Sequence, residues 1–326
     1  MDRIVSLLIY RFRKSLQHHA GERPMDLKQI EYILKIAEEN NITHAAEKLF
    51  ITQPALNQQL LKLEKELGTP LFHRSRSNWR LTEAGEIYVR NAKQILQIKK
   101  NTYEQIRDVA NRQKGILSIG FTPGRGVAIF GNVYPIFHHE FPDITVVPVE
   151  KRVKEMQSMI AGDQLDVAFM TLNEYDRTKD NYISLSNEEI LLGVPDGHPI
   201  CQSATPSPGH PWPILDLNLL KYEPFVLMDK KSTMCSLVER IFQESGFEPN
   251  ILFETQNNNT ILTMIRAKIC CGLIPAYYVQ GDISGISVFS MPAHPCWQIA
   301  ASYKKGRYLS QAAQRFIEIA KTFYIF

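Results

Sequence analysis

Residues 42–67 read ITHAAEKLFITQPALNQQLLKLEKEL. Apolar residues recur at helical spacing on both sides of the junction Phe50-Ile51-Thr52, so the stretch predicts two short helices joined by a tight turn. Pro54 falls in the first turn of the second helix, where its missing N–H is tolerated. A narrow leucine stripe on this second helix is expected to face a core: Leu56, Leu60, Leu63 and Leu67.

The opposite face of the second helix carries amides and almost no charge in its first turns. Gln53, Asn57 and Gln58 lie there, and such side chains pair with the N6 and N7 atoms of adenine in the major groove. A helix-turn-helix places the N-terminal residues of its second helix at base edges. The pattern therefore predicts a DNA-reading helix, with an ordinary solvated face as the alternative.

The stretch that follows, LGTPLFHRSRSNWRLTEAG (67–85), predicts a short two-stranded ribbon. Arg74 and Arg76 would lie near its tip, next to a turn at Ser77-Asn78. Beside a helix-turn-helix, such a ribbon is a wing whose arginines hold phosphates or enter the minor groove. A hairpin that only aids solubility is the alternative.

Helical spacing also predicts a helix from Leu27 to the Asn40-Asn41 break, and a long helix capped by Thr82. Thr43 is expected to cap the helix that follows Asn41. Along the long helix, residues recur near the heptad spacing of a two-stranded coiled coil: Tyr88, Ala92, Ile95, Ile98, Thr102, Ile106 and Val109. Two paired copies would present two DNA-reading helices to a palindromic site.

The 326-residue chain is long enough for two or three domains. Its formal net charge is +3, with a basic excess before residue 115 and an acidic excess after it, so the front suits a polyanionic partner. No apolar run reaches the ~18 residues of a membrane span. Residues 1–24 lack the order of a secretory signal and are expected to be a poorly ordered extension.

Five cysteines lack a C-x-x-C pair, which favours reduced thiols in a cytoplasmic protein and offers no metal-ligand spacing: Cys201, Cys235, Cys270, Cys271 and Cys296. A redox-sensing pair among them is the alternative. The histidines are scattered, and structural or solvated roles are expected for them. No G-x-S-x-G, H-E-x-x-H or P-loop pattern occurs, so no catalytic site is predicted.

From Gly115 onward, predicted strands and helices alternate, which favours an α/β fold with a parallel sheet. Strands are expected at GILSIGF, ITVVPVE, LDVAFM, EEILLGVP, EPFVLM, ILFET, ISVFSMP and CWQIAASYKK. A closing amphipathic helix is expected over 309–323.

Met25–Gly85 resembles the winged helix-turn-helix of LysR-type transcriptional regulators, on the ordered words AAEKL, QPAL, LEKELGTPLF and LTEAG. The family usually has Ser-Arg after Gln-Pro-Ala-Leu, where this chain has Asn57-Gln58. Carried over by position, the resemblance implies these DNA contacts: Thr43, Thr52, Gln53, Pro54, Asn57, Gln58, Arg74 and Arg76.

Residues 115–326 resemble the effector-binding half of that family, which is similar to two-lobed periplasmic solute-binding proteins. The implied fold is an α/β multidomain chain: an extension over 1–24, a winged helix-turn-helix over 25–83, a linker and dimerisation helix over 84–113, and an effector domain over 114–326. Lobe I would take 115–187 and 292–326, and lobe II 188–291.

Ligands of open α/β sheets bind at the carboxyl ends of strands, near helix N-termini. In the effector domain this rule selects Thr122, Pro123, Gly124, Arg125, Thr171, Ser232, Thr233, Asn258 and Thr260. Free N–H groups there suit a carboxylate, and Arg125 would add charge, so an anionic effector is the hypothesis. Helix capping is the alternative role for each of these residues.

The sequence thus predicts a transcriptional regulator, not an enzyme, with no cofactor, metal or membrane partner. Its expected partners are double-stranded DNA, a small-molecule effector, further copies in a homodimer and homotetramer, and RNA polymerase. Two rivals remain open at this point. One is a solute-binding protein whose front half only dimerises, and the other is a two-lobed α/β enzyme using Cys235 or Cys270.

Overall fold

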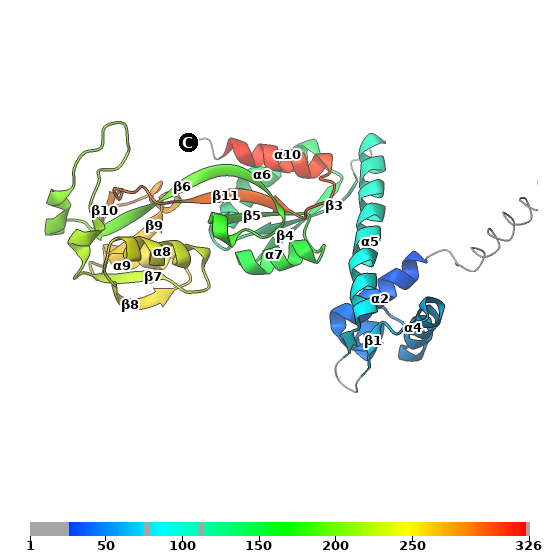
Figure 1. Cartoon of the computed structure of the whole chain (residues 1–326). Helices are drawn as coiled ribbons and strands as arrows, with labels where there is room; N and C mark the ends of the chain where they lie inside the picture. The colour runs from blue at the N-terminus through cyan, green and yellow to red at the C-terminus, as the bar shows by residue number, and fades with distance from the viewer. Residues whose placement is uncertain (1–25, 75–78, 111–113, 324–326) are drawn as a thin grey trace, which may run out of the picture. The chain divides into compact units, whose positions relative to one another are not determined.

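The computed structural model describes residues 26–74, 79–110 and 114–323 (Figure 1). The chain divides into two compact units, the first running to Tyr103 and the second starting at Glu104. The predicted extension over 1–24 lies outside the described residues.

The first unit is three helices, a ribbon and most of a long helix. Its elements are α2 (Leu27–Glu39), α3 (Ile42–Lys48), α4 (Gln53–Leu67), β1 (Phe72–His73), β2 (Arg80–Leu81) and α5 (Glu83–Val109). The core of this unit contains Leu56, Leu60 and Leu63, as predicted, whereas Leu67 at the end of α4 is exposed. In the ribbon, Phe72 pairs with Leu81 in the antiparallel register that a wing requires.

The caps of these helices follow local geometry. The Asn41 side chain accepts hydrogen bonds from the N–H groups of Thr43 and His44, at 2.8 and 3.2 Å. The predicted cap at Thr43 is therefore wrong, because the extended backbone of Asn41 already brings a side-chain oxygen over the free N–H groups of α3. Thr52 caps α4 through Ala55, and Thr82 accepts a hydrogen bond from the Gly85 N–H at 3.0 Å.

The two ends of α5 have different surroundings. Val89 and Ala92 are buried, and Tyr88 packs against the core of the first unit. Tyr88 and Ala92 therefore pack within their own subunit. They are not available for the coiled-coil seam that the sequence predicted for them. Further along, Ile98, Ile106 and Val109 are 65%, 61% and 86% exposed, so none of the residues that the structure describes covers the later part of the stripe.

The second unit is built on a mixed sheet with strand order β10-β6-β11-β5-β3-β4, and β9 pairs with β6. These strands are β3 (Gly115–Phe121), β4 (Ile144–Glu150), β5 (Val167–Leu172), β6 (Asn181–Pro195), β9 (Gly272–Pro275), β10 (Ile286–Phe289) and β11 (Cys296–Tyr303). Within this sheet, the parallel arrangement that the sequence predicted holds for β3, β4 and β5. It fails at β11, which is antiparallel to both β5 and β6.

Helices cover this sheet, and a second small sheet completes the unit. The helices are α6 (Arg125–Glu140), α7 (Val153–Ala161), α8 (Thr233–Glu244), α9 (Asn258–Arg266) and α10 (Gln311–Thr322). The short 3-10 helices are Glu174–Asp176, Pro199–Ser203, Leu217–Leu220 and Ala276–Val279. Strands β7 (Pro224–Met228) and β8 (Asn250–Thr255) form a parallel pair.

The long strands β6 and β11 run from one lobe into the other (Figure 1). One core gathers side chains from β3, β5, α6 and α10, and another gathers side chains from β6, β7 and α8. Trp297 packs in this second core, although the predicted boundary assigns it to lobe I. The reason is that β11 enters lobe I only after its first residues.

Candidate nucleic-acid interface and ligand pocket

The outer face of α4 is the candidate nucleic-acid interface. Gln53, Pro54 and Gln58 are exposed and Asn57 is half-buried, while the leucine side of the helix is sealed in the core. Thr52 and Thr43 are also exposed. The predicted DNA contacts on α3 and α4 are therefore surface residues, and Arg76 lies outside the described residues.

Arg74 in the ribbon is held by its own subunit. Its guanidinium forms an ion pair with Glu64 of α4 and lies 5.7 Å from the ring of Trp79. The other oxygen of Glu64 accepts the Leu71 N–H at 2.8 Å. This arrangement fixes the ribbon to α4, so Arg74 positions the wing and only part of its side chain remains exposed for a phosphate.

Phe50, in the turn between α3 and α4, is a feature that sequence reasoning missed. Its side chain is 95% exposed, and its φ of 55° lies in the left-handed region that residues other than glycine rarely adopt. The turn is fixed by the Phe50 N–H, which donates to the Glu47 carbonyl at 3.1 Å. The available signal was a large aromatic residue in the short junction between two predicted helices.

A cavity of about 150 Å3 lies between the two lobes of the second unit. Most of the predicted ligand residues line it: Thr122, Pro123, Arg125, Thr171, Ser232, Thr233 and Asn258. Thr260 does not, because it lies two positions beyond Asn258 on α9 and so points about 200° around the helix. Gly124 does not line it either; its φ is 78°, and a Cβ there would be 3.0 Å from the Tyr278 hydroxyl.

Four helices begin at the wall of this pocket. Arg125, Val153, Thr233 and Asn258 are the first residues of α6, α7, α8 and α9, and all four line it. Helix N-termini carry partial positive charge and unpaired N–H groups. Ser232 satisfies one N–H of α8, whereas Gly124 precedes α6 and offers no side-chain cap. The pocket is therefore electropositive through its backbone.

A buried ion pair forms the floor of the pocket. Arg125 is 5% exposed and pairs with Glu188 of β6, and its guanidinium also lies 4.8 Å from the ring of Tyr277. Glu188 accepts two further hydrogen bonds, from Trp297 Nε1 at 2.7 Å and from the Tyr277 N–H at 2.8 Å. Glu188 thus balances the charge of Arg125, so the anion hypothesis depends on other groups.

A second ion pair crosses the pocket from lobe to lobe. Both terminal nitrogens of Arg152 lie 3.2 Å from the carboxylate oxygens of Asp229. Lys231 adds another cation to the lining. Arg152 and Asp229 are 77 positions apart, so no local sequence pattern could have paired them.

Two uncharged groups complete the lining. Burial raises the pKa of Tyr278, while Asn258 and Arg125 oppose that rise, so its hydroxyl stays protonated and can donate. The Oδ1 atom of Asn258 is buried and has no hydrogen-bond partner among residues 26–74, 79–110 and 114–323. A buried acceptor without a partner is costly, which marks this atom as a binding group for a ligand donor.

The thiols suspected under the enzyme alternative are unsuited to nucleophilic chemistry. Burial, helped by nearby Glu239, raises the pKa of Cys235 to about 11. Burial likewise raises the pKa of Cys270 to about 11. Because the thiolate is the reactive species, both side chains should react slowly near neutral pH.

Two family matches span nearly all of the described chain. Residues 27–86 match the family described as bacterial regulatory helix-turn-helix protein, lysR family, and residues 110–324 match the LysR substrate binding domain. The chain belongs to the LysR family. It shares 28% identity over 309 residues with the HTH-type transcriptional regulator YcgK of Bacillus subtilis, covering 91% of this chain and 94% of that protein.

A second relative of this LysR-family chain is the Hca operon transcriptional activator HcaR of Escherichia coli. It is 27% identical over 300 residues, which cover 91% of this chain and 97% of HcaR. Among solved structures, a full-length OxyR variant from Pseudomonas aeruginosa has a TM-score of 0.62 at 23% identity, covering 92% of this chain and 97% of that one. This likeness confirms the predicted fold.

The LysR-family chain is therefore a DNA-binding transcriptional regulator with an effector-binding domain, as the sequence predicted. The family and the relatives are regulators, so the prediction that the chain is not an enzyme is confirmed and both rivals are set aside. Among the described residues, no helix is long and apolar enough to cross a membrane.

Proposed function

We propose that this regulator reads its operator with the N-terminal end of α4 and senses a carboxylate-bearing small molecule in the pocket between its lobes. The observation that carries the proposal is the convergence of four helix N-termini on one cavity. The side chains exposed on α4, in the pocket and along α5 indicate which partner each surface binds.

For DNA, the exposed amides on α4 are the base-reading groups. Gln53, Asn57 and Gln58 can each donate and accept, which suits adenine edges. Thr43, Thr52 and Pro54 are exposed and Arg74 follows β1, so these residues are proposed as further DNA contacts, and so is Arg76, which lies outside the described residues. Phe50 adds an exposed ring next to α4, whose apolar surface suits a thymine methyl or a sugar.

For the effector, the positive helix ends and Lys231 favour a carboxylate. The Oδ1 atom of Asn258 can accept a hydrogen bond from a ligand donor such as a hydroxyl or an amine. The hydroxyl of Tyr278 and those of Thr122, Thr171, Ser232 and Thr233 supply further hydrogen bonds. A small acid bearing one donor group therefore complements the pocket. Arg125 and Glu188 support its floor.

For assembly, the exposed part of the α5 stripe is the surface for a second copy. Ile98, Ile106 and Val109 lie exposed along one helix, and an antiparallel or parallel partner helix would bury them. The proposal includes a homodimer through α5, a homotetramer as the working form, a cytoplasmic location and RNA polymerase as the protein partner. The oligomeric state, the location and the polymerase partner are proposals that go beyond membership of the LysR family.

The switch is a shift between two arrangements of the lobes. The Arg152–Asp229 pair bridges the lobes at the pocket mouth, so a carboxylate arriving beside Arg152 competes with Asp229 for it. A ligand can shift the balance only if it binds one arrangement more tightly. Because the carboxylate competes with Asp229 for Arg152, it would bind the arrangement in which this ion pair is broken more tightly than the one in which it is intact.

The experiment has a DNA arm and an effector arm. Asn57→Ala with Gln58→Ala should weaken operator binding by tenfold or more, while Lys65→Ala on the far end of α4 serves as the control. For the effector, calorimetry with small hydroxy acids is compared with titration of their neutral amides. Tight binding by the amides alone would remove the anion proposal, and an unchanged operator preference in the double variant would remove the DNA proposal.

A further inference from the structure

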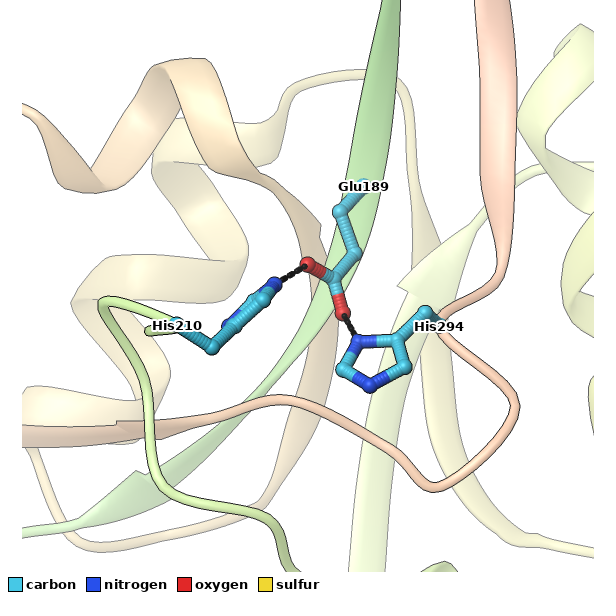
Figure 2. A group of neighbouring side chains, drawn as sticks. All are labelled: Glu189, His210 and His294. Atoms are coloured by element: carbon cyan, nitrogen blue, oxygen red, sulfur yellow. Dashed lines mark hydrogen bonds and ion pairs between the residues drawn. The ribbon is translucent and has the colours of Figure 1, made fainter. Parts of the chain in front are cut away.

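Three side chains from distant parts of the sequence meet at one edge of lobe II. Figure 2 shows Glu189 at the centre, with His210 and His294 pointing at its two carboxylate oxygens. Glu189 belongs to β6, His210 to the long loop after β6, and His294 to the turn before β11. No local pattern points to this cluster, because the three positions have no ligand spacing along the chain.

The geometry of this cluster is that of converging ligands. His294 Nδ1 lies 2.9 Å from Glu189 Oε1, and His210 Nε2 lies 3.2 Å from Glu189 Oε2. One ligand atom from each of the three residues lies within 4.8 Å of the other two. Nitrogen and oxygen atoms bound to one tetrahedral zinc ion are separated by about 3.3 Å, given bond lengths near 2.05 Å. The two short His–Glu189 distances end on different carboxylate oxygens, so the three groups converge within 4.8 Å and reach a single ion after small side-chain rotations.

A hydrogen bond orients His210. Its Nδ1 lies 3.2 Å from the hydroxyl of Ser290, a fully buried residue. If Nδ1 carries the proton and donates to Ser290, Nε2 is left as the basic nitrogen facing Glu189. Ligating histidines are commonly held by such a bond on their other ring nitrogen.

The backbone also fixes the loop that carries His210. The Ser290 N–H donates to the Pro213 carbonyl at 2.9 Å, and the Leu215 N–H donates to the Ser290 carbonyl at 2.9 Å. These two hydrogen bonds attach the loop, at Pro213 and Leu215, to the residue that follows β10. Both histidines and Glu189 are half-buried, so an ion can reach them from solvent.

We propose that Glu189, His210 and His294 bind a divalent transition-metal ion, with Zn2+ as the preferred class, and leave a fourth position to solvent. Two imidazoles and one carboxylate are the donor set that zinc accepts in open sites. Mg2+ and Ca2+ prefer oxygen ligands and are excluded by the two nitrogens. A bound ion would join the long loop, β6 and the turn before β11.

The proposed metal site is separate from the ligand pocket between the two lobes. Glu188 and Glu189 are neighbours on β6, and successive strand residues point to opposite faces. Glu188 faces Arg125 and the ligand pocket, and none of the three proposed metal ligands lines that pocket. The proposal therefore stands whether or not the pocket binds a carboxylate.

Cys296 is the competing donor that the test must address. It pairs with Glu189 across the β6–β11 ladder, which places both side chains on the same face. Its Sγ contacts the His294 carbonyl at 3.2 Å. A thiol-centred site would need Cys296, whereas the proposed site does not.

The test is titration of the full-length, untagged protein with ZnCl2, read by calorimetry and by competition with a coloured zinc chelator. His210→Ala and His294→Ala should each weaken the tightest site by at least tenfold, and Ser290→Ala by about tenfold through loss of the orienting bond. MgCl2 at the same concentrations should produce no competition. Circular dichroism confirms that each variant is folded.

His198→Ala is the matched control, because His198 lies on the same loop and faces Glu223 at 3.6 Å, outside the cluster. It should bind Zn2+ like the unmodified chain, and so should Cys296→Ser. Equal binding by all the histidine variants would overturn the proposal. Loss of binding in Cys296→Ser with retention in the His210 and His294 variants would also overturn it.

Discussion

Glu188 shows how one side chain can join both lobes. It accepts hydrogen bonds from Trp297 and Tyr277 and neutralises Arg125, all in a buried site. Sequence reasoning found Arg125 from its place after a strand but not Glu188, because the pairing depends on how β6 crosses to the other lobe. Local patterns specify strand ends well and long-range partners poorly.

Glu188→Ala should lower the free energy of unfolding by about 3–5 kcal/mol, since it leaves the Arg125 guanidinium buried without its counter-charge. Urea denaturation measures the loss. Glu244→Ala removes an exposed pair with Arg240 and should change stability within experimental error. Equal effects from the two substitutions would contradict the buried-pair interpretation.

Cys235 should react slowly with iodoacetamide, and its rate should rise steeply with pH. A pKa of about 11 leaves roughly 0.1% thiolate at pH 8, so each added pH unit below 11 increases the rate about tenfold. Mass spectrometry between pH 7 and 9 follows the labelling, with glutathione as the reference thiol. A rate that levels off below pH 9 would show that the thiol ionises more easily than this environment allows.

At the scale of elements, the helix-turn-helix followed from the sequence because most of its local signals agreed with the final packing. Leu56, Leu60 and Leu63 of the α4 stripe are buried and the two-stranded ribbon forms, whereas Leu67 is exposed and the cap of α3 is Asn41 instead of Thr43. The parallel arrangement was predicted correctly for β3, β4 and β5 but not for β11, because the direction of β11 depends on a return from lobe II that no local pattern encodes. The pocket residues on helix ends were found, and the lobe-bridging Arg152–Asp229 pair was not.

Gly85 illustrates a close approach between elements. A Cβ at this position would lie 2.1 Å from the Leu71 carbonyl oxygen, so α5 can pack beside β1 only if residue 85 is glycine. Gly85→Ala should destabilise the first unit by about 1–3 kcal/mol through overpacking. Thermal unfolding measures the change.

Gly131→Ala is the control for Gly85→Ala, because residue 131 is inside α6 and a Cβ there meets nothing within 4 Å. Alanine at 131 should stabilise by up to about 1 kcal/mol through helix propensity. If both alanines shift the transition in the same direction, the steric argument for Gly85 is wrong.

At the scale of the whole molecule, the exposed apolar stripe of α5 predicts that two copies associate through this helix. Ile98→Asp places a charge in the exposed stripe and should lower the mass of the assembly at micromolar concentration by separating subunits paired through α5, because burying an unpaired carboxylate is unfavourable. Light scattering after size exclusion measures the mass. Lys93→Ala, on another face of α5, should leave the mass unchanged, and an unchanged mass in Ile98→Asp would exclude α5 as the interface.

The order of segments in the chain has a consequence for synthesis. Strand β11 lies between β5 and β6 in the sheet, and α10 packs into the same core as β3 and β5, yet both are made after the elements of lobe II. A ribosome-bound chain can therefore fold its helix-turn-helix early, whereas the sheet of lobe I stays incomplete until β11 and α10 emerge. Each newly made subunit acquires the means to hold DNA before it acquires the means to sense.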